Sequence, residues 1–331
     1  MNRRKLLTRG LALGSLMATA ATARPAFAQA RYPQYPIRFI APRAAGGVVD
    51  IAGRLWADRM SHHLGARFII ENQTGGGGTL GAIAVARAAS DGYTLLAGSG
   101  SELVISYLIA SKPAYDPIND FAAITINAVT VPGIMVSAGL PVRTVPELVS
   151  YAKANPGKLS YGSPGSGTVG NLCGELFKQL TGLTDIVHVP YKGGNNALAD
   201  LYGGQIPMVS TSVSQQTVEA EKAGKLRMLV AAGTRRLTGA PNVPIGAEVG
   251  YPDLIAEMFM GAFAPAKTPR AIIEQISDAS KKVMADEDFQ RRLIENGFEP
   301  ILDSDPDQAA AYLKREITRW RPILEAAGFK N

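Results

Sequence analysis

The chain has 331 residues, of which 46% are hydrophobic and 19% charged, and it contains 35 glycines, 21 prolines, three histidines and one cysteine. This length allows one large domain or two ordinary ones with their own cores, and the apolar fraction excludes a disordered chain. A single cysteine excludes an internal disulfide or a thiolate metal cluster, and three histidines leave little material for a histidine metal centre.

Residues 1–30 are predicted to be an export signal peptide. They hold five basic residues and no acidic one, followed by the apolar stretch 11–18 and an A-x-A cleavage pattern that ends at Ala28. The apolar stretch is too short for a membrane span. Arg3 and Arg4 also fit the twin-arginine pattern, so Sec and twin-arginine export both stay open. An ordinary amphipathic helix is the less favoured alternative.

Cleavage near Ala28 also removes most of the net charge of +6. The whole chain has 34 basic and 28 acidic residues, and five of the basic ones lie in the signal, so the mature chain is nearly neutral. Nucleic acid is therefore not expected as a partner, because binding it requires a clustered basic face. No later segment approaches the ~20 apolar residues of a spanning helix, which predicts a periplasmic mature protein.

From residue 35 onward, β-rich runs alternate with helical patterns and Gly-rich turns, which is typical of α/β folds with largely parallel sheets. The predicted strands are 37–41, 67–70, 93–97, 122–130, 133–137, 158–161, 186–189 and 225–230. The predicted helices are 49–64, 80–89, 144–154, 168–181, 197–202, 270–296 and 306–327. The apolar run 255–263 is interpreted as a strand that crosses between two lobes.

Two segments, 76–81 and 165–170, satisfy the dinucleotide-binding pattern G-x-G-x-x-G. Each follows a predicted strand and opens a helix, and Asp185 lies twenty residues beyond Gly165. Asp185, however, stands before its strand and not at its carboxyl end. An exported oxidoreductase with a bound nucleotide cofactor is therefore kept only as the alternative function.

Gly-rich turns at helix N-termini present unpaired backbone N–H groups and the positive end of the helix dipole, which suits a carboxylate or a phosphate. Three such turns occur, at 46–47, 75–78 and 165–167, and hydroxyl groups stand beside two of them. Tight turns of an ordinary α/β sheet explain the same pattern, and that interpretation also stays open.

Groups suited to catalysis are few. Ser166 does not form a nucleophile elbow because Pro164 stands two residues before it. His188 lies in an apolar run and Cys173 in a helix, so both are expected in the core, and a nucleophile–base pair between His188 and Ser166 or Cys173 is the minor alternative. No sequence pattern indicates a metal site. We therefore expect no enzyme activity, no metal and no cofactor.

A series of longer motifs runs in order through the mature chain. It comprises the stretches 35–38, 45–50, 71–72, 75–78, 91–95, 115–117, 152–159, 165–168, 188–193, 223–227 and 261–265. This series resembles the Bug family, the periplasmic substrate-binding proteins of tripartite tricarboxylate transporters.

The resemblance implies a two-lobed α/β binding protein of the type II-like, Venus-flytrap kind. Residues 31–130 and 253–331 would form lobe one, and residues 131–252 lobe two. Such a protein closes around a small organic acid and delivers it to membrane permease subunits. A sensor kinase is kept open as another partner.

The resemblance also implies the ligand-binding residues. Those that match the family are Ala45, Gly46, Gly47 and Asp50 in lobe one and Ser163, Ser166, Gly167, Thr168 and Tyr191 in lobe two. Arg43, Asn171 and Thr211 stand where the family has an aromatic residue, a histidine and an acid.

These three departures affect the expected ligand. Without a carboxylate at Thr211 an ammonium group has no partner, and Arg43 offers a bidentate partner to a second carboxylate. A dicarboxylate, or an aromatic or aliphatic acid with a second acidic group, is expected over an amino acid. A monoacid, with Arg43 in solvent, stays open.

Overall fold

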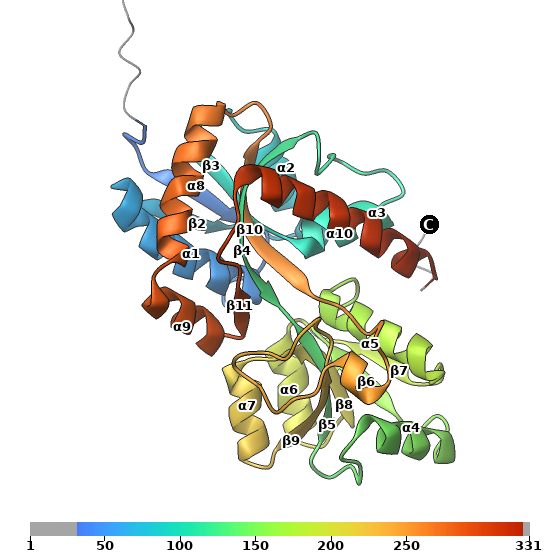
Figure 1. Cartoon of the computed structure of the whole chain (residues 1–331). Coiled ribbons are helices and arrows are strands. Elements are labelled where there is room, and N and C mark those ends of the chain that lie inside the picture. Colours follow the sequence, from blue (N-terminus) through green and yellow to red (C-terminus); the bar gives the residue numbers. More distant parts are fainter. Residues whose placement is uncertain (1–31, 327–331) are drawn as a thin grey trace, which may run out of the picture.

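The computed structural model describes residues 32–326, which form two α/β lobes, one above the other (Figure 1). The predicted signal peptide and its cleavage site lie outside the described residues. Among residues 32–326, no helix has the length and hydrophobicity needed to cross a membrane.

Lobe one is built on a six-stranded sheet with the order β11-β4-β10-β3-β1-β2. Its strands are β1 (Ile37–Ala41), β2 (Phe68–Asn72), β3 (Thr94–Ser99), β4 (Phe121–Thr130), β10 (Met258–Pro265) and β11 (Phe298–Pro300). Its longer helices are α1 (Val48–Leu64), α2 (Thr79–Ala86), α8 (Arg270–Met284), α9 (Glu287–Glu295) and α10 (Pro306–Ala326). The short helices η1 (Gly76–Gly78), η2 (Ser101–Ser106) and α3 (Tyr107–Ile109) also belong to it.

One part of the lobe-one core lies between α1 and the sheet, and buried residues of α8, α9 and α10 continue it. Phe39 of β1, Trp56 of α1 and Phe68 of β2 form a buried aromatic cluster with ring centroids 5.2–6.1 Å apart. Trp56 also donates a 2.9 Å hydrogen bond to Ser280 of α8. This packing fixes α1, and with it the loop that precedes α1, against the sheet.

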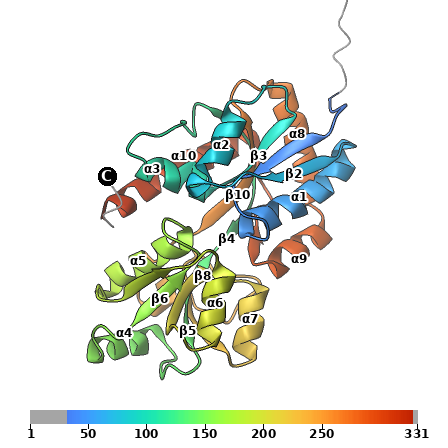
Figure 2. The ribbon, with the colours of Figure 1, turned by 180° about the vertical axis from the view of Figure 1, so that it is seen from behind.

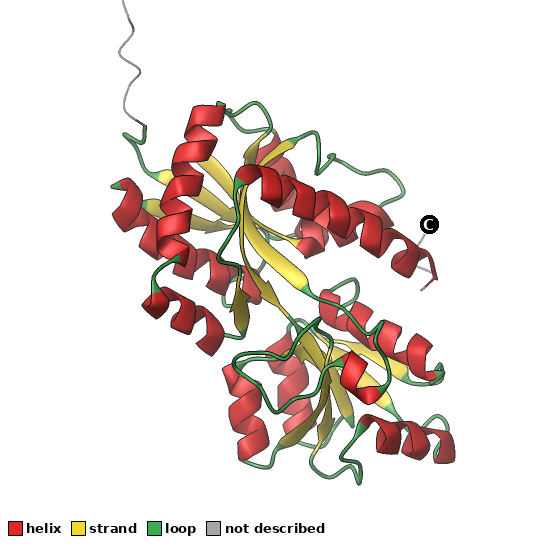
Figure 3. Cartoon of the chain, in the orientation of Figure 1, coloured by secondary structure: helices red, strands yellow, loops and turns green. Residues whose placement is uncertain are grey.

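Lobe two has a five-stranded sheet with the order β7-β6-β8-β5-β9 (Figure 3). Its strands are β5 (Pro132–Ser137), β6 (Ser160–Ser163), β7 (Val187–Pro190), β8 (Met208–Ser212) and β9 (Leu226–Ala231). Its helices are α4 (Val145–Ala154), α5 (Val169–Thr181), α6 (Gly194–Tyr202), α7 (Gln215–Lys222) and the short η3 (Gly246–Val249). The helices α5, α6 and α7 directly follow β6, β7 and β8, so their N-termini lie at one edge of the sheet.

The chain passes between the lobes twice. Val131 alone separates β4 from β5, and its carbonyl accepts a 2.9 Å hydrogen bond from Val213 N–H. The return passage follows β9, where Ala256 N–H donates to the Ala232 carbonyl at 2.8 Å.

The sequence predictions were wrong in three places and right about the crossing run. The run 255–263 does lead from one lobe to the other: Ala256 N–H donates to the Ala232 carbonyl beside β9, and from Met258 on the chain pairs with lobe-one strands as β10. The sheets, however, are mixed: β10 is antiparallel to β3 and β4, and β5 is antiparallel to β8 and β9. The predicted helix 270–296 is two helices, because Asp286 caps α9 by accepting hydrogen bonds from the N–H groups of Asp288 and Phe289. The elements η2, β8, α7 and β11 were not predicted.

Candidate functional site

A buried carboxylate, that of Asp50, holds the loop 42–47, which joins β1 to α1, through hydrogen bonds. Asp50 is 3% exposed; its Oδ2 accepts hydrogen bonds from Gly46 N–H and Arg54 Nε, both at 2.9 Å. Its Oδ1 accepts from Asn72 Nδ2 at 2.8 Å, and the same amide group donates to the Arg43 carbonyl at 3.0 Å. Asp50 therefore shapes this loop, with both carboxylate oxygens already bonded.

Asp50 stays ionised in this setting. Burial alone raises its pKa, but the hydrogen bonds from Arg54, Gly46 and Asn72 outweigh burial and hold the pKa below its usual value. Gly46 has φ of +75°, which non-glycine residues rarely adopt, so the loop geometry depends on a glycine here.

Only part of the backbone N–H groups expected at the predicted anion site are available to bind a ligand. Gly46 N–H is used by Asp50, and Gly47 N–H donates to the Ala44 carbonyl at 3.2 Å. Gly47 is the N-cap of α1, and no side chain among the described residues caps that helix. The available donors are therefore those of the first turn of α1, beside the exposed Ala45.

Arg43 points to a buried acid of its own lobe. Its Nε lies 3.8 Å from Oε2 of Glu102, a residue of η2 that is fully buried. Burial raises the pKa of Glu102, while Arg43 and two hydrogen bonds from Ser99 oppose the rise. Glu102 was not found by the sequence interpretation; the polar run 99–102 after an apolar strand was the signal for it.

In lobe two the turn 163–168 is held by its own side chains. Ser163 is buried, and its Oγ accepts from Gly165 N–H at 3.2 Å. Thr168 is the N-cap of α5: it accepts from Asn171 N–H at 3.3 Å and donates to the Gly165 carbonyl at 2.7 Å. Asn171 Oδ1 accepts from Gly167 N–H at 3.0 Å. These residues stabilise the turn, and Ser166 stands exposed at its tip.

Ser163 of this turn forms a serine–histidine pair with His188 of β7. Ser163 Oγ is 2.7 Å from His188 Nε2, and the His188 ring stacks on Tyr161 with centroids 4.9 Å apart. Burial lowers the pKa of His188, which favours the neutral ring at pH 7. Ser163 has no exposed surface, so no substrate can reach its hydroxyl. The prediction of a core position is wrong for His188, which is half-buried on the edge strand β7. It is confirmed for Cys173, which is fully buried; burial raises the pKa of Cys173 to about 12, which makes it a poor nucleophile.

Two further predicted site residues make contacts within lobe two. Tyr191 donates its hydroxyl proton to Asp200 Oδ2 at 2.7 Å, and burial together with Asp200 raises the pKa of Tyr191 to about 12. Thr211 is buried under the N-terminus of α6: a Cβ on Gly194 would lie 2.5 Å from Thr211 Oγ1. The predicted ribose-binding acid, Asp185, instead accepts from Gly157 N–H at 2.8 Å.

The two lobes approach each other at the turn 163–168. Gly167, with φ of +72°, would place a Cβ 3.7 Å from Ile109 of α3 in lobe one. Figure 2 shows α3 of lobe one facing α5 of lobe two. Arg43 is linked to the same part of lobe one, because its partner Glu102 lies in η2, which leads directly into α3.

Comparisons with known proteins agree with this architecture. The family model described as tripartite tricarboxylate transporter family receptor matches residues 52–329. The UPF0065 protein in the gbd 5' region of Cupriavidus necator is 34% identical over 329 residues, which cover 99% of this chain and 98% of that protein. BugT of Bordetella pertussis is 30% identical over 334 residues, which cover 100% of this chain and 99% of BugT.

Solved structures are similar over the same length. A Rhodopseudomonas palustris protein with adipate is 31% identical with a TM-score of 0.82, covering 90% of this chain and 98% of that one. MatC from the same species, with bound malate, is 29% identical with a TM-score of 0.78, covering 88% of this chain and 100% of MatC. The predicted two-lobed α/β fold and the resemblance to the Bug family are both confirmed, and the chain belongs to the solute-binding receptors of tripartite tricarboxylate transporters.

Proposed function

We propose that this receptor is a periplasmic, non-enzymatic protein that captures a small organic carboxylate between loop 42–47 and turn 163–168. The observation that carries this proposal is that each lobe has a helix N-terminus, that of α1 or α5, preceded by a turn that internal hydrogen bonds hold in shape. Such N-termini attract an anion through backbone N–H groups and the helix dipole. Relatives solved with adipate and with malate support a carboxylate ligand.

The predicted ligand-binding residues are proposed to have two different roles: some stabilise the two turns, and others contact the ligand. Asp50, Ser163, Thr168 and Asn171 stabilise the two turns, because their polar atoms are bonded within their own lobes. Direct contact with the ligand is proposed for the first turn of α1, the exposed backbone at Ala45, and the hydroxyl of Ser166. Closure of the lobes would bring these groups together on the ligand.

We further propose a ligand with two acidic groups. Thr211 offers no negative charge to an ammonium group, so an amino acid would leave that group unpaired. Arg43 is 3.8 Å from Glu102, which is longer than a hydrogen bond, so its guanidinium is not fully committed to that partner. A second carboxylate would share Arg43 with Glu102 and form the shorter, bidentate contact.

We also propose that the signal is cleaved near Ala28 and that the mature protein delivers its ligand to membrane permease subunits. The closed form would also be presented to a sensor kinase. Both follow from family membership and not from a surface seen in this chain.

The test is calorimetric titration of the purified mature chain with succinate, adipate, malate, aspartate and matched monoacids. A diacid should bind at least ten-fold more tightly than aspartate or the monoacid of equal length. Arg43→Ala should remove that preference, whereas Arg87→Ala, exposed at the far end of α2, should keep it. If Arg43→Ala keeps the full preference, or aspartate binds as tightly as succinate, the proposed pocket chemistry is wrong. Turnover of any bound acid would contradict a pure receptor.

A further inference from the structure

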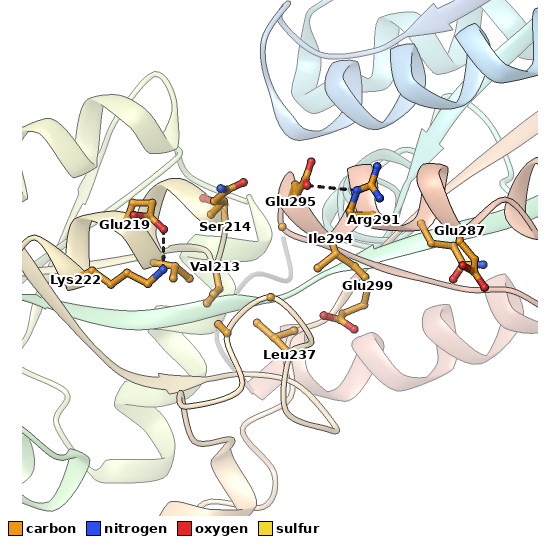
Figure 4. Close-up of a pocket in the computed structure, with 16 residues that line it drawn as sticks. Val213, Ser214, Glu219, Lys222, Leu237, Glu287, Arg291, Ile294, Glu295 and Glu299 are labelled. Atoms are coloured by element: carbon orange, nitrogen blue, oxygen red, sulfur yellow. Dashed lines mark hydrogen bonds and ion pairs between the residues drawn. The ribbon is translucent and has the colours of Figure 1, made fainter.

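A separate pocket of about 370 Å³ lies between the lobes, on the β11 side of the molecule (Figure 4). Lobe two contributes the start of α7 and residues 237–240, and lobe one contributes α9 and the chain around β11. No residue of loop 42–47 or of turn 163–168 lines it. Its volume lies in the range of pockets that hold small molecules.

The floor of this pocket is apolar. Val213, Leu237 and Ala240 reach it from lobe two, and Ile294 reaches it from α9 in lobe one. Leu237 and Ala240 are 6% and 5% exposed, so the floor continues the buried core of lobe two up to the interlobe boundary. A ligand with an apolar body therefore gains contact area here.

The walls carry an excess of negative charge. Four carboxylates, Glu219, Glu287, Glu295 and Glu299, line the pocket, against the two cations Lys222 and Arg291. Lys222 pairs with Glu219 at 2.8 Å and Arg291 pairs with Asp288 and Glu295, so Glu287 and Glu299 are the two lining acids that no lining cation neutralises. The pocket is thus unsuited to the carboxylate proposed for the first site and suited to a cation.

Glu299 is the best-placed acid. It is 5% exposed, and its two oxygens accept hydrogen bonds from Thr238 N–H at 2.6 Å and Thr238 Oγ1 at 2.8 Å. Its nearest cation, Arg235, is 3.7 Å away and largely exposed. A carboxylate accepts about four hydrogen bonds, so Glu299 keeps capacity for another donor.

We propose that this pocket binds a small organic ammonium ion with an apolar, ring-sized or branched body. The body covers the apolar floor, and the ammonium group donates to the carboxylates of the wall. The two walls belong to different lobes, so the pocket keeps this shape at only one interlobe angle. A bound amine therefore favours that angle and is coupled to carboxylate binding through the hinge.

The direct test titrates the mature chain with 2-phenylethylammonium chloride, followed by calorimetry and by thermal shift. The matched anion 3-phenylpropionate, which has a similar ring and chain, is the comparison ligand. The amine should raise the melting temperature and should bind with the acid-binding mutant Ser166→Ala as with wild type. If the amine binds no more tightly than the anion in this pair, the proposal is overturned.

Two pairs of variants locate the binding. Gln215→Trp fills the pocket from α7 and should weaken amine binding at least ten-fold, whereas Gln216→Trp, its exposed neighbour outside the pocket, should not. Glu287→Gln with Glu299→Gln should weaken it about 2- to 10-fold, because the two lining acids that no lining cation pairs with are removed. Asp278→Asn, an exposed acid of α8 outside the pocket, is the charge control. Equal amine affinity in Gln215→Trp and Gln216→Trp would overturn the assignment even if carboxylate binding is intact.

Discussion

Asp50→Ala tests whether one buried carboxylate organises loop 42–47. The substitution removes the acceptor of three hydrogen bonds, which leaves Gly46 N–H without that partner and Asn72 Nδ2 with the Arg43 carbonyl alone. The bonds from Gly46 and Asn72 to a charged acceptor contribute about 1.5–3 kcal/mol each. Arg54 is half exposed, so its ion pair adds less than about 1 kcal/mol. The free energy of unfolding should therefore fall by about 3–7 kcal/mol.

The assay is urea unfolding of wild type, Asp50→Ala and the control Asp58→Ala. Asp58 is an exposed residue of the same helix whose nearest cation is 3.9 Å away, so its loss should cost less than about 0.5 kcal/mol. The control should also keep its carboxylate affinity, which Asp50→Ala should lose at least ten-fold. Equal unfolding midpoints for the two variants would refute the assignment of Asp50 as the organising residue.

The pH dependence gives an independent check on the same residue. The folded-state pKa of Asp50 is lower than its unfolded value of 3.8, so its contribution is fully present above pH 3.8. It is lost as the pH falls through the lowered folded pKa. The stability difference between wild type and Asp50→Ala should therefore shrink in that acid range; a difference independent of pH would contradict a charge-based role.

Two further predictions concern turn 163–168. Ser166→Ala should weaken carboxylate binding by about 1.5–3 kcal/mol, measured by calorimetry, and leave the unfolding free energy unchanged. Thr168→Ala should lower the unfolding free energy by about 1 kcal/mol, measured by urea titration, because Thr168 caps α5. Equal stability loss in both variants would contradict these separate roles. His188→Gln should flatten the pH dependence of stability below pH 6.5. Burial lowers the folded-state pKa of His188, so the contribution of His188 to stability is present above pH 6.5 and is lost as the pH falls through that lowered pKa. An unchanged slope in that variant would count against a half-buried, neutral His188.

The sequence was sufficient to predict elements whose pattern is local. Strand β1 and helix α1 follow from an apolar run and the Gly-rich turn between them, and Gly65 ends α1 in the left-handed conformation that glycine favours. The face was misjudged: the stripe expected in the core was Ile51, Leu55 and Leu64, whereas α1 buries residues such as Trp56 and Met60. The turn 163–168 was found for the same reason: its glycines and hydroxyls stand next to one another in the chain.

Features that depend on distant partners could not be predicted. The pairing of Arg43 with Glu102 joins residues that are far apart in the sequence, and nothing near Arg43 indicates that a buried acid will face it. The antiparallel placement of β10 is set by where the chain returns from lobe two. The boundary between α8 and α9 is different: Asp286 followed by two acids was a readable N-cap that the periodic pattern around it obscured.

The single residue between β4 and β5 limits how this receptor can be altered. Side chains alternate faces along a strand, so inserting one residue next to Val131 would turn every inward side chain of β5 outward unless the extra residue bulged. The hydrogen bond from Val213 N–H to the Val131 carbonyl fixes this joint to β8 as well. The other passage is short as well: Ala256 N–H is bonded to the Ala232 carbonyl of lobe two, and only Glu257 separates Ala256 from β10. The angle between the lobes is therefore open to change by substitution at the two passages, whereas an insertion at either one disturbs the pairing of a strand.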